Sequence, residues 1–193
     1  MTRPIRAVGL VVAAVLLAAC GVPTSDRARS VPDHQVPFHL LSPTTSSTTT
    51  TQPAAAYVTE PIFLARDASI VEVHRDVVVP AGLTDVLDAL FAGPTASETS
   101  QGITTALPSS LKVLDTTTEG ARVTLDLSDR FGQITGEAET TAVAQIVLTA
   151  TSQPGVTEVL FSIAGRPISV PTPNGVTTAQ PVTAADYRPM VRP

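Results

Sequence analysis

The chain has 193 residues, of which 43% are hydrophobic and 4% aromatic, and it carries a formal net charge of −5. This length is enough for one domain with its own core once a targeting segment is set aside. Fifteen acidic and eight basic side chains follow residue 56, which argues against binding nucleic acid or anionic lipid through charge. The single cysteine, Cys20, has no partner for a disulfide within the chain.

The start of the chain has the layout of an export signal. Arg3 and Arg6 precede an almost unbroken apolar run over residues 8–19. This run is too short to span a bilayer, which needs about 20 apolar residues. Residues 17–21 read LAACG, which resembles the lipobox of a bacterial lipoprotein signal peptide. An ordinary cleavage site with an incidental cysteine is the alternative interpretation.

The resemblance to a lipobox implies a lipid anchor at Cys20. Residues 1–19 would then be the signal peptide, and cleavage would leave Cys20 as the mature N-terminus, with a diacylglyceryl group on its sulfur and fatty acids such as palmitate. Two or three acyl chains hold a protein stably on a bilayer. We therefore expect a protein anchored in the cell membrane on its extracytoplasmic face.

Residues 20–56 are expected to form a linker between this anchor and a domain over residues 57–193. The segment has no sustained hydrophobic periodicity and ends in a Ser/Thr/Pro tract at residues 42–53. Such a composition cannot bury enough apolar surface to offset its conformational entropy. Fully extended, the linker would reach roughly 110 Å at about 3.1 Å per residue. The tract either is bare or carries O-linked sugars.

Two strands and a helix are predicted at the start of the domain. Residues 62–64 and 70–77 are rich in β-branched side chains and flank a turn at residues 66–69. The helix is predicted from apolar side chains at helical spacing, and Gly93 with Pro94 indicates its end. Its apolar positions are Leu83, Val86, Leu87, Leu90 and Phe91. Residues 95–110 are predicted to form a polar loop.

A second hairpin and a second helix follow the loop. The hairpin has strands at residues 111–117 and 121–127, and apolar and polar side chains alternate in the second strand. The helix covers residues 137–152, with Glu137 and Glu139 in its first turn, where acidic side chains are favourable.

The last predicted strands cover residues 157–164 and 168–170, with a turn at residues 165–167 between them. Two strands, a helix, two strands, a helix and two strands therefore follow one another. This order predicts an α+β fold, a single compact domain in which a small mixed or antiparallel sheet is packed by two helices.

Five short motifs in this region resemble the GerMN domain of spore germination and sporulation proteins and of actinobacterial lipoproteins. They are Gly93-Pro94, Leu107-Pro108, LDLS at residues 125–128, QIVLT at residues 145–149, and VLF at residues 159–161 leading to Gly165-Arg166-Pro167. The resemblance covers about residues 57–187. It implies an extracytoplasmic binding or assembly module rather than an enzyme, and it carries no catalytic residue over to this chain.

The sequence shows no catalytic or metal-binding constellation. His74 is the only histidine after residue 56, and no nucleophile motif accompanies it. Clustered His or Cys ligands for a metal are absent from the sequence. Two carboxylate pairs, Asp126 with Asp129 and Glu137 with Glu139, have a composition that a glycosidase uses. Capping and solvation explain them more simply, so we expect no cofactor and no metal.

Three functions remain open from the sequence. The first is a binding module for an envelope protein or for cell-wall glycan, tethered through the lipidated Cys20. The second is a ring-type structural module that assembles into a homo-oligomer. The third is a cell-wall hydrolase, which is the least favoured because no catalytic set is visible. The sequence identifies neither the ligand nor the binding face.

Overall fold

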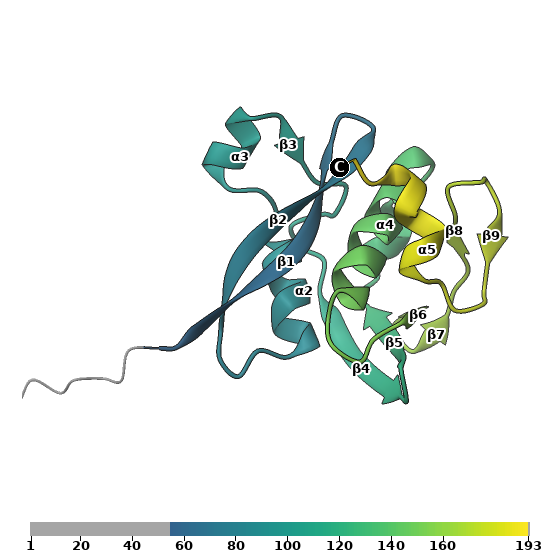
Figure 1. The fold of residues 1–193 in the computed structure, drawn as a ribbon. Helices are drawn as coiled ribbons and strands as arrows, with labels where there is room; N and C mark the ends of the chain where they lie inside the picture. Colours follow the sequence, from purple (N-terminus) through teal and green to yellow (C-terminus); the bar gives the residue numbers. More distant parts are fainter. Residues whose placement is uncertain (1–54, 193) are drawn as a thin grey trace, which may run out of the picture. The chain divides into compact units, whose positions relative to one another are not determined.

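The computed structural model describes residues 55–192 (Figure 1). The elements in this range, in chain order, are β1 (Tyr57–Arg66), β2 (Ser69–Val78), α2 (Leu83–Phe91), α3 (Ala96–Ser100), β3 (Ile103–Thr104), β4 (Val113–Glu119), β5 (Arg122–Leu127), η3 (Phe131–Gln133), α4 (Glu137–Thr151), β6 (Glu158–Ile163), β7 (Arg166–Pro167), β8 (Val170–Pro171), β9 (Thr177–Thr178), α5 (Ala184–Tyr187) and η4 (Arg188–Met190). The expected signal peptide, Cys20 and residues 20–54 of the expected linker lie outside the described residues.

The first sheet is built on a regular hairpin. β1 and β2 pair antiparallel in continuous register from Tyr57 opposite Val78 to Arg66 opposite Ser69. β3 pairs with the last two residues of β1 on its other side, so the strand order is β2-β1-β3. The predicted hairpin is confirmed. Its first strand is longer than the predicted residues 62–64, because pairing with β2 extends it back to Tyr57.

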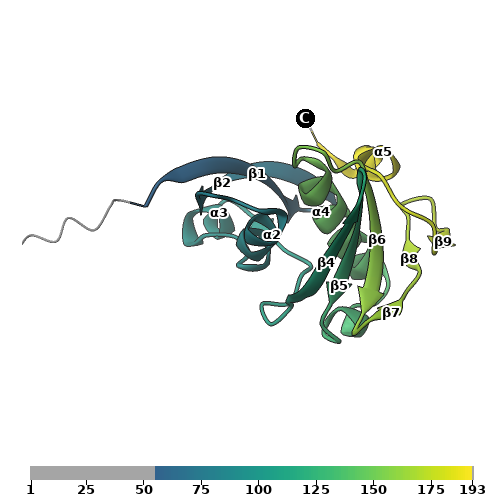
Figure 2. The ribbon, with the colours of Figure 1, turned by 90° about the horizontal axis from the view of Figure 1, so that it is seen from below.

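Two helices, α2 and α3, cover one face of this sheet (Figure 2). The predicted helix is confirmed as α2, and its buried face consists of Val86, Leu87, Leu90 and Phe91. α3 lies inside residues 95–110, which were predicted to be a loop. Thr95 and Glu98 form a capping box there, in which the Thr95 N–H donates to Glu98 Oε2 at 2.7 Å. The sequence pattern T-x-x-E therefore indicates this helix start.

The second sheet contains the predicted second hairpin and a parallel strand. β4 and β5 pair antiparallel with a bulge between Val113 and Asp115, and β6 runs parallel to β5 along its whole length. A parallel neighbour needs a crossover connection, and α4 provides it. The domain is of the predicted α+β class. Its strands divide into two main sheets, because the β1–β2 hairpin pairs with β3 and not with β4–β7.

The end of the domain differs from the prediction. The turn after β6 consists of Ala164 and Gly165, whose φ angles are 48° and 76°. Arg166 therefore pairs with Ile163 in β7 instead of lying in the turn. The predicted strand at residues 168–170 is wrong, because Val170 alone of these residues is in a strand, β8, and β8 pairs with β9.

α4 forms the centre of the core. Its residues 142–150 are all buried, because β1, β6, β8, α2 and α5 pack around it (Figures 1 and 2). A helix that covers one sheet face has a single apolar stripe, whereas a helix enclosed on all sides is buried all round. Within residues 55–192, no helix is long and apolar enough to cross a bilayer.

Candidate functional site

Two polar side chains of α4 satisfy the backbone of β1. The Gln145 Nε2 group donates to the Phe63 carbonyl at 3.1 Å, and the Thr149 hydroxyl accepts from the Phe63 N–H at 3.0 Å. Gln145 Oε1 also accepts from the Ala106 N–H at 2.9 Å. Gln145 and Thr149 are fully buried, and buried polar groups need such partners. The polar positions of the QIVLT motif therefore have a structural role.

Asp126 and Ser128, the polar residues of the LDLS motif, also serve the fold. Asp126 Oδ1 accepts hydrogen bonds from the Ser162 hydroxyl and from the Gly165 N–H, each at 2.8 Å. Ser128 Oγ accepts from the Lys112 N–H at 3.2 Å, beside the end of the β4–β5 pair. These contacts agree with the structural explanation that the sequence favoured for Asp126, and they give Ser128 a structural role as well.

The remaining candidates for catalysis lie on different elements. His74 is on β2, its side chain is 60% exposed, and its Nε2 lies 3.6 Å from Glu72 Oε1. Glu137 and Glu139 are exposed in the first turn of α4. In the described part of the chain, no three His, Cys, Asp or Glu side chains are placed to hold a metal ion. The ion-pair partner of His74 is thus Glu72, and not a member of either predicted carboxylate pair.

Arg75 and Glu98 form the most shielded ion pair among residues 55–192. Arg75 Nη1 donates to Glu98 Oε1 at 2.8 Å, and the two side chains are 17% and 16% exposed. The hydrogen bond from Arg75 lowers the pKa of Glu98 from 4.5 to about 2, against the opposing effect of burial. Arg75 Nη2 also donates to the Gly93 carbonyl at 3.3 Å. The pair therefore fastens α3 and the end of α2 to β2.

The chain after β8, where the sequence predicted no element, closes over α4. Val182 and Val159 exchange two backbone hydrogen bonds of 2.9 Å. Tyr187 is fully buried, burial raises the pKa of its hydroxyl, and this hydroxyl donates to a carbonyl of β8 at 2.8 Å. Thr183 and Asp186 form a capping box at the start of α5. That T-x-x-D pattern is the sequence signal that could have revealed this helix.

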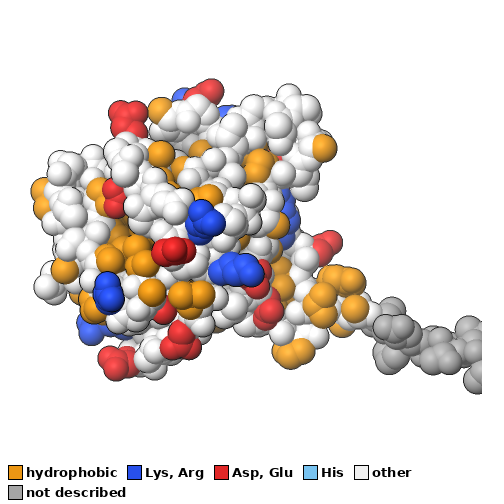
Figure 3. All heavy atoms as spheres, turned by 180° about the vertical axis from the view of Figure 1, so that it is seen from behind, with side chains coloured by type: hydrophobic (Ala, Val, Ile, Leu, Met, Phe, Trp, Pro, Cys, Tyr) orange, Lys and Arg blue, Asp and Glu red, His pale blue; other side chains and the backbone are white. Residues whose placement is uncertain are grey.

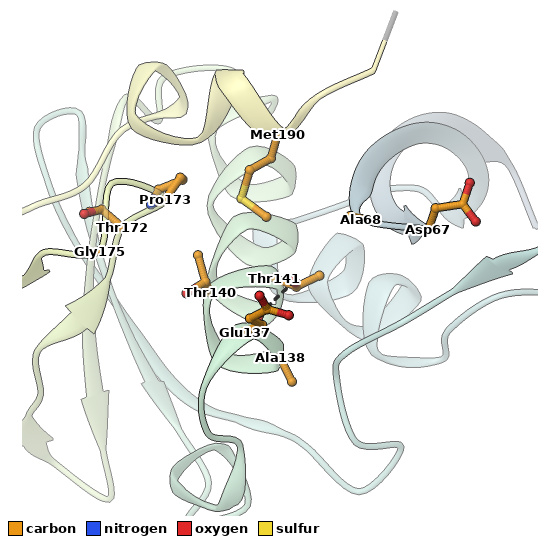
Figure 4. Close-up of a pocket in the computed structure, with 10 residues that line it drawn as sticks. All are labelled: Asp67, Ala68, Glu137, Ala138, Thr140, Thr141, Thr172, Pro173, Gly175 and Met190. Carbon is orange, nitrogen blue, oxygen red and sulfur yellow. Dashed lines mark hydrogen bonds between the residues drawn. The ribbon is translucent and has the colours of Figure 1, made fainter.

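An open pocket of about 500 Å³ lies at the N-terminal end of α4 (Figure 4). The β1–β2 turn, α4, the β8–β9 turn and the end of η4 contribute its lining, which is Asp67, Ala68, Glu137, Ala138, Thr140, Thr141, Thr172, Pro173, Gly175 and Met190. Of the carboxylates singled out in the sequence, Glu137 lines it. The Thr141 hydroxyl donates to the Glu137 carbonyl at 3.0 Å. The pocket offers hydroxyl and carboxylate groups to a polar ligand.

The open end of the β1–β2 hairpin exposes apolar side chains on both faces. The exposed fractions are 61% for Tyr57, 36% for Val58, 52% for Val78 and 46% for Val79. Successive strand residues point to opposite faces, so Tyr57 and Val78 share one face while Val58 lies on the other. We call these four residues the ribbon end. Figure 3 shows hydrophobic side chains gathered where the described chain begins. An exposed apolar cluster is a candidate interaction surface.

A protein-family model that matches this chain shows to which family it belongs. The model of the Germane family, described as "Sporulation and spore germination", matches residues 61–169, which is more than half of the chain. The chain belongs to the Germane family. Its GerMN domain is the one that the five sequence motifs indicated, and this resemblance is confirmed.

Two solved GerMN structures share the fold. The tandem GerMN domains of the sporulation protein GerM from Bacillus subtilis match with a TM-score of 0.53 and 24% identity, over 66% of this chain and 45% of that chain. The chain thus spans less than half of the tandem structure. The first GerMN domain of the same protein matches with a TM-score of 0.51 and 19% identity, over 67% of this chain and 99% of that chain. A comparison with curated protein sequences finds no match.

The Germane match contains the motif residues whose roles the structure explains. Asp126, Gln145 and Thr149 lie inside the matched residues, whereas Tyr57, Val58 and all elements from β8 onward lie outside them. The descriptions of the family and of the two GerM structures name no ligand. The polar residues of the GerMN motifs therefore make hydrogen bonds that connect elements of the fold. The choice of a binding surface rests on this chain's own exposed residues.

Proposed function

We propose that this chain is a membrane-anchored extracytoplasmic lipoprotein whose GerMN domain binds another envelope protein and catalyses no reaction. The anchor rests on the LAACG sequence at residues 17–21, in which Cys20 is the single cysteine of the chain. The binding function rests on the ribbon end. Tyr57 directly follows the expected linker, so this surface includes the first residues of the domain after the anchor and the linker.

We infer the absence of catalysis because the buried and half-buried polar side chains already make structural hydrogen bonds or ion pairs. The Asp126 carboxylate already accepts two hydrogen bonds. Gln145 and Thr149 hold β1 to α4, and Glu98 is paired with Arg75. The strongly shifted pKa values belong to such structural groups, whereas a general acid or base needs a shifted pKa within reach of substrate.

The ribbon end carries the proposal, because its apolar side chains project on both faces of a paired hairpin. The Val79 N–H donates to the Ala56 carbonyl at 2.9 Å, so the two strands remain paired to the end of the hairpin. A partner that encloses this end would bury both faces at once. Tyr57 is of the residue type that most often dominates protein interfaces, since it combines a large apolar ring with a polar hydroxyl.

A second candidate ligand is cell-wall glycan, which the pocket at the N-terminal end of α4 favours. Thr140 and Thr172 in its lining present hydroxyl groups, and Asp67 and Glu137 present carboxylates. These are groups that hydrogen-bond sugar hydroxyls and amines. This site is separate in its residues from the ribbon end, so the two candidates can be tested independently.

The direct test is chemical crosslinking in cells that make the tagged full chain, followed by purification. The variant Tyr57→Ser/Val79→Ser removes half of the ribbon end. The matched control is Leu114→Ser/Val176→Ser, which removes two apolar side chains that are 53% and 58% exposed elsewhere. We expect a partner protein that the first variant loses and the control retains. Sedimentation with purified wall, without a protein adduct, would favour the glycan. The absence of both an adduct and sedimentation would refute binding.

A further inference from the structure

β2 has an outer edge whose backbone groups are available for pairing. The Arg192 N–H donates to the Ile70 carbonyl at 2.9 Å from the side opposite β1. The N–H and C=O of one strand residue point to the same side of the strand, and alternate residues share that side. The backbone groups of every second residue after Ile70 therefore point away from β1. These residues are Glu72, His74, Asp76 and Val78. Pro61 lies opposite His74 and has no N–H to donate, which agrees with a position where β1 and β2 exchange no backbone hydrogen bond.

This edge is open over residues 72–78. Within residues 55–192, no backbone hydrogen bond reaches the N–H groups of the four outward residues. The His74 carbonyl accepts from Arg75 Nη1 at 3.0 Å, and its second lone pair remains for another donor. At Ile70 the edge is closed, because Val191 and Arg192 already lie against it.

The edge lacks a bulge, a proline and a lysine, which protect many edge strands from pairing, although Glu72, Arg75 and Asp76 on it are charged. Natural edges are blunted by bulges, prolines, lysines or short length. β4, the outer strand of the second sheet, has a bulge between Val113 and Asp115. β2 pairs with β1 over its full length without a bulge, and residues 72–78 contain neither proline nor lysine.

The charges on this edge fit a second copy of the chain in one antiparallel register. Symmetric pairing of residues 72–78 is centred on Arg75, which places His74 opposite Asp76 of the second copy and Glu72 opposite Val78 of the second copy. A His N–H can donate to a carboxylate. Asp76 Oδ1 accepts from the Thr59 hydroxyl at 2.8 Å, which leaves Oδ2 for His74.

The neighbouring registers are unfavourable. A shift that centres the pairing on His74 sets Glu72 opposite Asp76 of the second copy twice, and like charges directly opposite are destabilising. A shift the other way centres the pairing on Asp76 and sets the two Asp76 carboxylates opposite each other, which is again a like-charge pair. The charges therefore favour the register centred on Arg75, in which the two Arg75 residues also lie opposite each other but each guanidinium is paired with the Glu98 of its own chain.

We propose that two copies of this protein pair edge to edge through β2, antiparallel about Arg75, and join their three-stranded sheets into one continuous sheet. His74 then donates a hydrogen bond to Asp76 of the second copy on each side of the two-fold axis. Arg75 stays on the other face, paired with Glu98. This pairing needs no envelope protein, although Val78 belongs both to this edge and to the ribbon end.

Disulfide crosslinking of the purified full chain in solution tests the register. In a Cys20→Ser background, the double variant Glu72→Cys/Val78→Cys places thiols opposite each other. A hydrogen-bonded antiparallel pair has a Cα separation of about 5.5 Å, which a disulfide can span. The single variants Glu72→Cys and Val78→Cys should not crosslink, because the same residue in the two copies is roughly 20 Å apart along the strand. A crosslinked dimer from the double variant alone is the expected result.

Two results of this experiment would overturn the proposal. One is the lack of a dimer in the double variant. The other is an equal yield from Glu72→Cys alone or from Thr117→Cys/Glu119→Cys on the exposed β4 edge, which would indicate random collision. The purified chain contains no envelope partner, so neither result depends on whether the ribbon end binds one in cells.

A charge exchange at the centre tests the contact between His74 and Asp76. In the Glu72→Cys/Val78→Cys reporter, His74→Glu sets two like-charge pairs across the axis and should lower the crosslinking yield about tenfold. Adding Asp76→Lys turns both pairs into opposite charges and should restore the yield. If the yield is unchanged by His74→Glu, or if Asp76→Lys does not restore it while circular dichroism shows a folded chain, the proposed register is wrong.

Discussion

Gln145 of α4 and Phe63 of β1 are joined by a hydrogen bond of 3.1 Å between the side-chain amide and the backbone carbonyl. Thr149, one helical turn further on, accepts from the N–H of the same Phe63. Both backbone groups of Phe63 are therefore satisfied by a helix, at a point of β1 that β3 does not reach. The QIVLT motif encodes this joint between the central helix and the first sheet.

Replacing Gln145 with Leu should destabilise the domain strongly. The Phe63 carbonyl and the Ala106 N–H would lose their buried partner, and an unsatisfied buried group costs about 1–3 kcal/mol. We expect the free energy of unfolding in urea to fall by about 2–4 kcal/mol. Gln180→Leu, at an exposed position, is the matched control and should change it by less than about 0.5 kcal/mol. Equal effects of the two variants would contradict the proposed joint.

Asp126 should be required for stability through its acceptor oxygen and not through its charge. Asp126→Ala removes the acceptor for Ser162 and Gly165 and should lower the free energy of unfolding by about 1–3 kcal/mol. Asp126→Asn keeps an acceptor oxygen and should lose less than half of that amount. Urea titrations of both variants measure this. An equally large loss in Asp126→Asn would show that the negative charge matters most.

Because of the Arg75–Glu98 pair, the free energy of unfolding should decrease as the pH falls in the acidic range. The pKa of Glu98 is about 2 in the folded domain, against an ordinary value of 4.5. Between these values the unfolded chain binds more protons, so the stabilisation is fully present above about pH 4.5 and is lost as the pH falls toward 2.

Unfolding free energies measured from pH 7 to pH 2 check this dependence. The difference between the parent chain and Glu98→Gln should be constant above pH 4.5 and should shrink below it. Glu119→Gln, an exposed carboxylate on β4, serves as the control and should show no such pH-dependent difference. A difference between parent and Glu98→Gln that stays constant down to pH 2 would mean that the pair does not lower the pKa.

The lipid anchor predicts a simple labelling result. Cells grown with labelled palmitate should incorporate the label into the chain, and Cys20→Ser should abolish incorporation, because the thiol is the only group in the expected lipobox that can carry a thioether. The chain has no other cysteine, so no second thiol confuses the result. Label that remains in Cys20→Ser would place acylation elsewhere.

Local patterns in the sequence predicted the hairpins and α2 well, because each depends on neighbouring residues. Helical spacing of apolar side chains gives α2, and turns between β-branched runs give the β1–β2 and β4–β5 hairpins. The division into two sheets could not be predicted in this way. It depends on which strands meet in space, and α4 is buried on every side because both sheets and α5 pack against it.

The candidate surfaces were hidden from sequence reasoning for a similar reason. Tyr57, Val58, Val78 and Val79 are aromatic or β-branched, as core strand residues are, and only the fold shows that they are left exposed. The pocket beside α4 brings together turns far apart in the chain. The two missed helices, α3 and α5, did carry a signal, since Thr95 with Glu98 and Thr183 with Asp186 have capping-box spacing.

The most direct test of the central claim is site-specific photocrosslinking of the full chain in cells. A photoreactive phenylalanine analogue replaces either Tyr57 in the ribbon end or Val176 in the β8–β9 turn, which are similarly exposed at 61% and 58%. Binding of an envelope protein at the ribbon end predicts a discrete adduct from position 57 and none from position 176. The lack of an adduct at position 57, or the same adduct from both positions, would contradict it.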